Sequence, residues 1–595
     1  MNRTKVIFSS LLVLTSFCFG IWFSTSEPEP SRFENETHQF SYTLASPSLY
    51  ESAVATAQDI DRTGTRSGIV AHHLLVGDKI AQTFAALGNG REKTVVILSP
   101  NHFDAGRSVM QTTDGTWETA FGDVEVDTDV FEELLDGVEG MGYESETFVN
   151  EHGVSAIVPF VKKFFPDAKI VPIVIHDDAT TTQIVDLAHT IQEAAPRAIV
   201  LASIDMSHNL PEHIRVPHDE ETLAAIERGT CGDVTIVGGD RDCHLEIDAN
   251  DVLETLFWVN QLRGTQEWHL THHGSSLAMQ ATSDWRENTS HILGYFKRGK
   301  PVDEPFFSIQ LVGDVMLDRG VRTKIESQGV DYPWKEVERF LQGAHLRVAN
   351  LEGTISEEPS IATVEPPFRF TFAPEFVEAM LPFIDVVSLA NNHSRDRDIE
   401  GEGETQSWLD ALEIEWFGSY ATSWLTYRYN NISFVGYHEF GSRIPDLTPI
   451  IEQEARDGQF VIVMPHWGQE YVAVPQEGQR ELATKMVEAG ADLIIGGHPH
   501  VIQGIELIDD TPVIYSLGNF IFDQVEPGTD VGMSATVLFY EDGGMIYLSP
   551  VATIGGQPVP LSDQEAQIIF QNIASLSSEN LAPDILTGAI PFSYD

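Results

Sequence analysis

Apolar runs that each stop on a polar residue recur along the second half of the chain. They are rich in β-branched residues and alternate with stretches that carry apolar residues at helical spacing, such as 374–383, 403–413 and 477–490. This alternation predicts an α/β fold with a sheet buried on both faces, whose ligand sites lie at the carboxyl ends of the strands. The runs end at Asp314, at Asn350 and Glu352, at Asn392 and His393, at His466, at His498 and His500, and at Asn519. We therefore expect one polar cluster at one edge of the sheet.

The side chains at these run ends are of the types that bind divalent metal ions. Carboxylates, an asparagine carbonyl and imidazoles suit ions such as Mn, Fe or Zn, and two ions ~3.5–4 Å apart can hold an attacking water and the oxygen under attack. A single loop histidine is usually hydrogen-bonded or solvated, and Asn-His is a common turn pair. His498 and His500 are more specific, because they lie one residue apart after a buried run. The recurrence of such residues favours a dinuclear metal site.

A fainter form of the same pattern occurs in the first half of the chain. Three apolar runs end at His72 or His73, at His102, and at Asp205 with His208. Histidines with a carboxylate can form a mononuclear site that binds an iron-type ion and leaves positions open for a substrate. Roles in the core or in capping are about as common for such short patterns, so both interpretations stay open.

Length and composition indicate two folded domains. A chain of 595 residues exceeds what one core usually supports, and 42% hydrophobic residues are enough for two cores. We expect a polar stalk over residues 24–60 and a first α/β domain over 61–297. A charged, Pro-containing linker over 298–304 would then lead to a second α/β domain over 305–595.

Residues 1–23 consist of a basic flank and an uncharged stretch of 18 residues. The stretch is long for the core of a signal peptide and just long enough for a membrane helix. We therefore expect a signal anchor in the cell membrane, with both domains outside the cytoplasm. The alternative is a cleaved signal peptide and a secreted protein. In that compartment Cys231 and Cys243 could form one disulfide, or they could remain free, buried thiols.

The chain is strongly acidic, with 90 Asp and Glu against 35 Lys and Arg and a formal net charge of −55. This charge argues against binding to nucleic acid and against broad contact with anionic lipids. An acidic protein also repels an acidic polymer over a Debye length of about 8 Å, unless metal ions or a local basic patch intervene. Contact with such a polymer is therefore expected to be confined to particular sites.

Six segments of the second half resemble the successive motifs of the CapA family of capsule or poly-γ-glutamate biosynthesis proteins. They are GDVMLDRG, ANLEGTIS, SLANNHSRD, PHWGQEY, GADLIIGGHPHVIQ and YSLGNFIFDQ, within residues 306–530. The resemblance implies a calcineurin-like metallophosphoesterase fold. It also implies that His393 polarises or protonates the reacting group and that Asn350 supports a ligand. The metal ligands that it implies are Asp314, Glu352, Asn392, His466, His498 and His500.

The chain departs from the wider phosphoesterase pattern at two of these positions. Val315 and Met316 follow Asp314 where an Asp-x-His motif is usual, and Glu352 stands where an Asp is usual. Phosphatase activity therefore does not follow from the resemblance alone.

The first half is similar to the Memo family, also called the AmmeMemoRadiSam system protein B family. The segments GIVAHHLL, LSPNHF, NEHGVSAIVPF, SIDMSHN and HILGYF carry the similarity over residues 68–296. It implies a fold related to class III extradiol dioxygenases, in which His72, His102, Asp205 and His208 are the candidate metal site. The family's Cys-Gly is replaced by IDANDV around Asp248. This domain would then use Asp248 as a ligand or bind no metal.

Two functions are consistent with these features. The first is an envelope-associated, metal-dependent hydrolase that acts on a cell-envelope polymer, such as poly-γ-glutamate, or on a phosphoester. The second is a noncatalytic factor that tethers or exports an acidic polymer through bound metal ions. Two closely spaced imidazoles beside His393 favour catalysis, because a tether does not need them.

Overall fold

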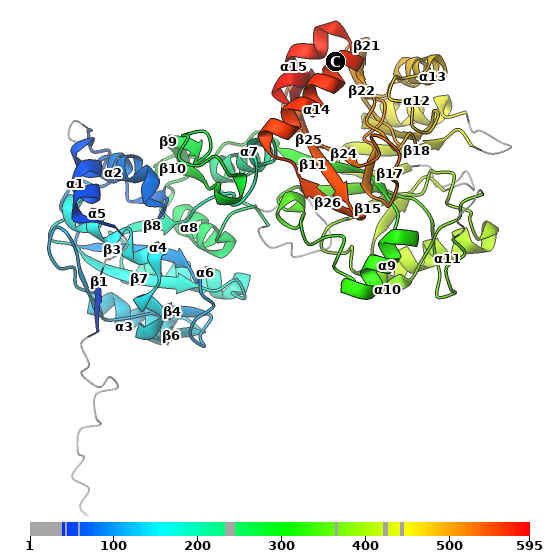
Figure 1. Cartoon of the computed structure of the whole chain (residues 1–595). Helices are drawn as coiled ribbons and strands as arrows, with labels where there is room; N and C mark the ends of the chain where they lie inside the picture. The colour runs from blue at the N-terminus through cyan, green and yellow to red at the C-terminus, as the bar shows by residue number, and fades with distance from the viewer. Residues whose placement is uncertain are drawn as a thin grey trace, which may run out of the picture.

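The computed structural model describes residues 38–41, 45–57, 60–231, 244–362, 367–419, 426–440 and 446–594. They form two mixed α/β regions, coloured blue to green and green to red in Figure 1. The expected anchor over residues 1–23 lies outside the described residues. Of the two cysteines considered for a disulfide, Cys231 is disulfide-bonded, and Cys243 lies outside the described residues. None of the helices in the described ranges is long and apolar enough to cross a membrane.

One eight-stranded sheet, in the order β6-β4-β7-β3-β8-β2-β10-β9, organises the first region. Its central strands β2 (Ser67–Val70), β3 (Thr94–Pro100), β7 (Lys169–Ile175) and β8 (Ile199–Ser203) are parallel. The outer strands are β4 (Met110–Thr112), β6 (Met141–Tyr143), β9 (Glu267–Ser275) and β10 (Ser290–Lys297). The central strands are unbroken apolar runs because both faces of the sheet are covered.

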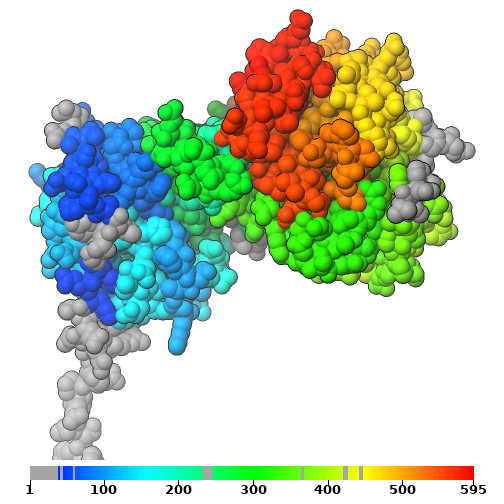
Figure 2. All heavy atoms as spheres, in the orientation of Figure 1, coloured from blue at the N-terminus to red at the C-terminus, as the bar shows by residue number. Residues whose placement is uncertain are grey.

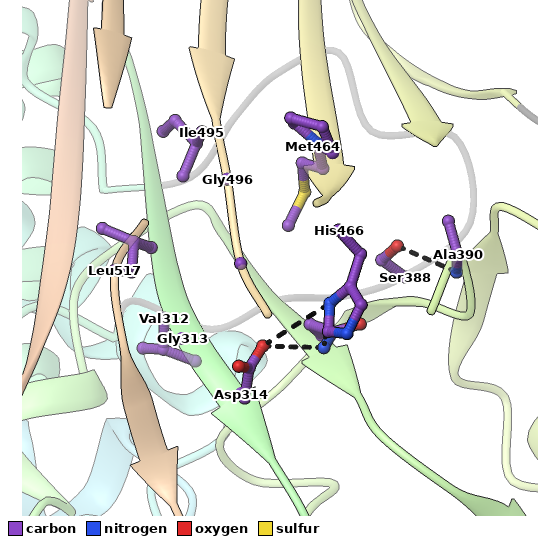
Figure 3. A pocket seen from close by; sticks show the side chains of 13 residues that line it. Val312, Gly313, Asp314, Ser388, Ala390, Met464, His466, Ile495, Gly496 and Leu517 are labelled. Atoms are coloured by element: carbon purple, nitrogen blue, oxygen red, sulfur yellow. Dashed lines mark hydrogen bonds and ion pairs between the residues drawn. The ribbon is translucent and has the colours of Figure 1, made fainter. Parts of the chain in front are cut away.

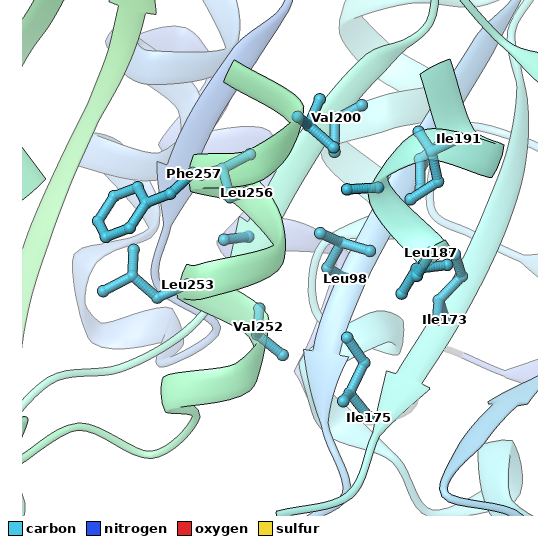
Figure 4. Close-up of a cluster of buried hydrophobic side chains, with 14 of the residues drawn as sticks. Leu98, Ile173, Ile175, Leu187, Ile191, Val200, Val252, Leu253, Leu256 and Phe257 are labelled. Atoms are coloured by element: carbon cyan, nitrogen blue, oxygen red, sulfur yellow. The ribbon is translucent and has the colours of Figure 1, made fainter. Parts of the chain in front are cut away.

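Helices cover both faces of this sheet. The helices α3 (Thr128–Gly137), α6 (Thr181–Ala194) and α8 (Asn250–Arg263) pack on one face. The helices α1 (Pro47–Ala55), α2 (Gly77–Ala86) and α5 (Val158–Phe164) pack on the other. Figure 4 shows the first of these cores, in which Leu187 of α6 and Leu256 of α8 converge on Leu98 of β3.

Part of the expected stalk belongs to the first region. The short strand β1 (Gln39–Ser41) pairs in parallel with β5 (Thr116–Glu118), and Tyr50 of α1 is fully buried in the core. The helix buries Tyr50 and Ala53, which are three residues apart on one face. Because so few positions of the helix are apolar, its sequence shows little periodicity. The stalk expected over 24–60 is therefore wrong for residues 39–41 and 47–55, which belong to the first region.

The second region contains two large sheets instead of the single sheet expected from the apolar runs. One sheet follows the path β16-β15-β12-β11-β24-β25-β26, with β23 beside β11 and β27 beside β25, and the other has the order β17-β18-β19-β20-β22-β21. The strands of the first sheet are β11 (Phe307–Val315), β12 (Leu346–Leu351), β15 (Val386–Ser388), β16 (Glu415–Phe417), β23 (Asn519–Ile521), β24 (Val531–Tyr540), β25 (Gly543–Ile554), β26 (Gln557–Pro560) and β27 (Ala589–Ser593). The strands of the second are β17 (Thr426–Tyr429), β18 (Ile432–His438), β19 (Phe460–His466), β20 (Leu493–Ile495), β21 (Ile505–Ile508) and β22 (Thr511–Ile514).

The two sheets pack face to face and carry helices on their outer faces. Leu311 and Val348 of one sheet share a core with Ile462 and Leu493 of the other. The helices α9 (Arg319–Gln328), α10 (Pro374–Glu378) and α11 (Asp398–Ala411) cover the first sheet, and α12 (Thr448–Arg456) and α13 (Glu477–Glu488) cover the second. The central strands, such as β11 and β19, are thus buried on both sides, and an apolar run does not reveal which sheet it joins.

The two regions form separate lobes that touch along one side (Figure 2). The expected linker, 298–304, runs between β10 and β11 outside any helix or strand. Helix α7 (Glu212–Arg228) adds a second connection, because Leu210 before it and Ile214 within it lie in the apolar cluster of the second region. His213 also bonds through Nδ1 to Asp563 of α14 (Asp563–Leu576) at 3.0 Å.

Ile214→Ala is expected to destabilise the second lobe, because Ile214 is fully buried in its core although it belongs to the first region. Truncation of a buried isoleucine costs about 2–5 kcal/mol. Denaturant unfolding measures the change, with Ile568→Ala as the control, since Ile568 is 54% exposed on α14. An unchanged unfolding midpoint for Ile214→Ala would mean that α7 does not contribute to the second core.

Candidate metal centres

Strand ends from both sheets of the second region meet at one edge of the sandwich. Asp314 in β11 and His466 in β19 point toward each other, with 4.0 Å between Asp314 Oδ1 and His466 Nδ1 (Figure 3). Asn350 at the end of β12 donates from Nδ2 to Asp314 Oδ1 at 2.8 Å. A cavity of about 20 Å³ lies beside them, which is room for roughly one water. Residues from two sheets therefore form one site.

His498 and His500 enter this site from the loop after β20. His498 Nδ1 lies 3.2 Å from His466 Nε2, and His500 Nδ1 lies 3.3 Å from Asp314 Oδ2. Both histidines have left-handed backbones, with φ of 92° and 58°. Such strain costs about 1–3 kcal/mol per residue and is typical of functional sites. Gly497 allows the close approach, because a Cβ there would lie 2.9 Å from Asp314 Oδ1.

Glu352 is a fully buried carboxylate whose two oxygens make no hydrogen bond to any described residue. The nearest ring nitrogens are His393 Nε2 at 3.7 Å and His500 Nε2 at 3.9 Å from its Oε1. Burial raises the pKa of Glu352 to about 7, and Asp314 adds to the effect. A buried carboxylate without hydrogen bonds is costly unless a cation compensates it. The surroundings of Glu352 therefore fit a metal ion.

The imidazoles of the site differ in charge. Burial lowers the pKa of His498 to about 3 and that of His466 well below its usual value, and neighbouring histidines add to both effects. These two rings are therefore neutral and can offer lone pairs to a metal. Burial also disfavours charge on His500, but Glu352 and Asp314 outweigh it and raise the pKa of His500 to about 9.

Two neighbouring asparagines border the cluster. Asn392 places Oδ1 2.8 Å from His466 Nε2, the same nitrogen that His498 approaches. Asn391, which the sequence analysis did not single out, donates from Nδ2 to Asn350 Oδ1 at 3.0 Å. Asn391 thus positions the residue that holds Asp314.

His393 lies at the rim of the cluster. Its Nδ1 is 2.8 Å from Asp396 Oδ2, while its Nε2 faces Glu352. Its ring packs on Phe370, with 4.2 Å between the ring centroids. A carboxylate on the far nitrogen fixes the ring orientation and leaves the other nitrogen directed into the site.

Two sets of potential ligand atoms each lie within 4.8 Å of one another, as one metal ion requires. The sets are Asp314, Glu352 and His466, and Glu470, His498 and His500. Glu470 was missed by the sequence analysis, because it follows His466 by four residues and so does not end an apolar run. The only sequence signal for it is its place within the PHWGQEY segment.

The first region brings together a second group at the ends of β2, β3 and β8. His72 Nε2 lies 3.2 Å from Asp248 Oδ2 and 3.4 Å from Asp205 Oδ2. His102 Nε2 lies 3.7 Å from Asp248 Oδ2, and its Nδ1 bonds to Glu151 at 2.6 Å. One oxygen each of Asp205 and Asp248 is buried without a hydrogen bond to the described residues. These free oxygens fit a cation here as well.

Two of the histidines considered in the sequence analysis stay outside this group. The ligand sets are His72, His102 and His152, and His72, Asp205 and Asp248. His208 belongs to neither set: its backbone bridges Thr289, although Asp248 and Asp205 are close enough to interact with the charge of its ring. His73 instead approaches His291, with 3.0 Å between Nδ1 and Nε2.

His152 is the residue of this group that sequence reasoning missed. It opens the short helix α4 (His152–Ser155) and so follows no apolar strand. Burial lowers its pKa to about 4, and His102 adds to the effect, so the ring is neutral at physiological pH. The EHG segment, in which Glu151 caps the helix, is its only signal in the sequence.

Comparisons with known proteins match the two regions separately. A family model described as bacterial capsule synthesis protein PGA_cap matches residues 308–439 and 442–524. A family model described as Memo-like protein matches residues 56–287. The resemblance to both families is thereby confirmed, with the Memo-like region preceding the CapA-like region.

Individual relatives agree with this division. The PGA biosynthesis protein CapA of Bacillus subtilis is 29% identical over 325 residues, which are 50% of this chain and 84% of that protein. The capsule biosynthesis protein CapA of Bacillus anthracis is 28% identical over 288 residues, or 43% of this chain and 69% of that protein. A MEMO1 family protein of Pyrobaculum arsenaticum is 33% identical over 165 residues, or 27% of this chain and 59% of that protein. The match to the Memo relative thus spans little more than half of its length.

Proposed function

We propose that this chain, which joins a Memo-like region to a CapA-like region, is an envelope-associated protein of capsule or poly-γ-glutamate biosynthesis with a dinuclear-metal-dependent hydrolase in its second region. The similarity to two CapA proteins supports the biosynthetic role. The observation that carries the hydrolase assignment is the buried carboxylate of Glu352, which makes no hydrogen bond to a described residue and faces His393 Nε2 at 3.7 Å and His500 Nε2 at 3.9 Å. The substrate would be a cell-envelope polymer or a phosphoester.

The donor set indicates where two ions would be held. Asp314, Glu352 and His466 would hold one ion, and Glu470, His498 and His500 the other, with Asn392 as a further ligand beside His466. Mixed carboxylate and imidazole ligands suit Mn, Fe or Zn. When bound, such ions supply an activated water and polarise the oxygen under attack. Two packed sheets with ligands at their strand ends support a calcineurin-like fold for this region.

The protein's own residues would carry the remaining steps. Asn350 holds Asp314 in place, and His393 can donate a proton from Nε2 to the leaving group. Asp396 accepts from Nδ1 of that ring and so keeps Nε2 directed at the site. Phe370 packs on the face of the His393 ring, with 4.2 Å between the ring centroids, and so helps to fix its orientation.

The proposed location rests on the N-terminal sequence and on one cysteine. The uncharged stretch of 18 residues in 1–23 would anchor the protein in the cell membrane with both regions outside the cytoplasm. The disulfide at Cys231 is in keeping with an oxidising compartment.

Metal analysis combined with a substrate screen tests the proposal. The full-length protein is expected to bind two ions in its second region and to hydrolyse poly-γ-glutamate or a phosphoester in a metal-dependent manner. Two bound ions with no turnover on any of these substrates would favour the tethering alternative. Absence of metal would refute both functions.

The first region is proposed to bind one iron-type ion, in a fold related to extradiol dioxygenases, through His72, His102 and Asp205 with Asp248 in place of the family's cysteine. Asp248→Ala is expected to abolish this ion, because Asp248 Oδ2 faces both His72 and His102. Asp248→Cys is the matched control and should retain metal, since a thiolate can take the same position. Elemental analysis checks the stoichiometry, and an unchanged value for Asp248→Ala would contradict the assignment.

A further inference from the structure

A cavity of about 630 Å³ lies in the first region, at the edge of the sheet opposite the His72 group. Strand β2 runs from Ser67 toward His72, and the antiparallel β10 returns to end at Lys297 beside the start of β2. The cavity is lined by residues just before β2, at the end of α8 and at the end of β10. Its size is within the range of ligand sites, ~300–1,000 Å³.

The lining of this cavity reverses the charge balance of the chain. Among the residues that the structure describes, Arg66, Arg263, Lys297 and Arg298 line it, and no Asp or Glu does. In the whole chain Asp and Glu outnumber Lys and Arg by 90 to 35. A concave site lined by cations alone therefore departs from the acidic character of the chain as a whole, and such a site concentrates anions.

Arg263 is a partly buried cation that forms no ion pair with a carboxylate of the described chain. Its Nε donates to Gln192 Oε1 at 2.8 Å, its Nη1 donates to the carbonyls of Ala198 at 3.1 Å and Arg66 at 3.3 Å, and its Nη2 donates to the carbonyl of Ala195 at 3.3 Å. Burial lowers the pKa of Arg263 to about 10, and Arg66 adds to the effect, so the group stays charged at neutral pH. The protein thus holds this guanidinium rigidly without neutralising it, and an anion in the cavity would compensate the charge.

Arg66 also lacks a strong partner within the described chain. Its Nε is buried without a hydrogen bond, and the nearest carboxylate, Glu92, lies 4.0 Å away. Glu92 itself accepts hydrogen bonds from the backbone of Asn89 at 2.8 Å and of Gly90 at 2.9 Å. The charge of Glu92 is therefore already satisfied by these amides.

Two further cations that line the cavity, Lys297 and Arg298, lie at and just after the end of β10. Lys297 lies over the ring of Tyr295, with 5.5 Å to its centroid, and Arg298 is exposed. Neither residue forms an ion pair with a carboxylate of the described chain. Because the cations come from three separate segments, positive charge is spread along the cavity and is not focused on one point.

We propose that this cavity binds a segment of a polycarboxylate chain, of the kind that a glutamate polymer presents. Guanidinium and ammonium groups pair strongly with carboxylates, and dispersed cations fit a chain with repeated charges better than a single phosphate group. The cavity supplies the local basic site that an acidic protein needs to hold an acidic polymer. This inference rests on the proposed polymer partner, but it does not depend on hydrolysis.

Binding of a fluorescently labelled γ-linked glutamate oligomer tests the cavity. Full-length protein is first freed of metal with EDTA, and the EDTA, which is itself a polycarboxylate, is removed by dialysis before the protein is titrated by anisotropy. The double variant K297E/R298E is expected to bind roughly tenfold or more weakly than the wild type, and wild-type binding should weaken as salt is raised. The control R286E/K335E makes the same change in charge at two cations that do not line the cavity. The side chain of Arg286 is 63% exposed and that of Lys335 is 49% exposed.

Three results would overturn the proposal. They are equal affinities of K297E/R298E and the wild type, an equal loss in the control, and preferential binding of orthophosphate over the oligomer. The same proteins, loaded with metal, are assayed for turnover, which the cavity variant should leave unchanged. If K297E/R298E loses oligomer binding but keeps turnover, the result supports the cavity and leaves the hydrolase proposal untouched. If the wild type binds the oligomer but shows no turnover, the hydrolase proposal fails and the cavity proposal stands.

Discussion

His500→Ala is expected to remove at least one metal ion from the second region while the fold stays intact. The imidazole faces Asp314 at 3.3 Å and Asn519 Oδ1 at 2.9 Å, so its loss deletes a ligand and exposes a gap beside the carboxylate. A loop imidazole contributes little to the apolar core, so the variant should keep the fold, although the metal-free protein loses a cation beside two buried carboxylates. Elemental analysis of the purified variant measures the stoichiometry.

The control for this experiment is a histidine of the other sheet, at the end of its strands that lies away from the site. His345 precedes β12 and bonds through Nδ1 to Ser308 Oγ at 2.7 Å, far along the strand from Asn350. His345→Ala should keep the full metal content. If His500→Ala also keeps it, the imidazole is not a ligand, and the assignment of the GGHPH segment fails.

Most of the site in the second region could be predicted from the sequence because its residues end apolar strands. Asp314, His466 and the histidines after β20 follow runs that are buried on both faces, and the carboxyl ends of such strands meet at one edge. Glu470 and Asp396 do not end a run, since they lie in loops that fold back over the site. Periodicity gives no signal for residues of that kind.

The arrangement of the sheets and lobes could not be predicted from the sequence in the same way. β11 and β19 have the same kind of apolar sequence but belong to different sheets, because burial on both faces gives the same pattern in either one. Ile214 lies three residues into a helix of the first region and packs in the core of the second. Such long-range partners depend on the tertiary fold and leave no local mark in the sequence.

His393→Ala is expected to keep the metal ions and to lower turnover by ~10²–10⁴-fold, the usual cost of losing a positioned acid or electrostatic donor. The ring offers Nε2 to the site but stays 3.7 Å from Glu352, and Asp396 holds its other nitrogen at 2.8 Å. Asp396→Asn is the informative partner variant. It keeps the shape of the pair but removes the charge that orients the ring, so an intermediate loss is expected.

A paired assay of turnover and polymer retention separates the hydrolase from the tether. A hydrolase should lose turnover in His393→Ala at constant metal content, because Nε2 acts on the substrate and not on an ion. A tether should show no turnover in the wild type and unchanged retention in His393→Ala. Its retention should nevertheless fall in Asp314→Ala, because that carboxylate faces His500 and His466 within the cluster. Retention is therefore measured with and without EDTA, so that polymer held by ions is distinguished from polymer held by the basic cavity. Wild-type turnover that survives His393→Ala undiminished would remove the proposed role of this histidine, whereas metal-dependent retention without turnover would establish the tether.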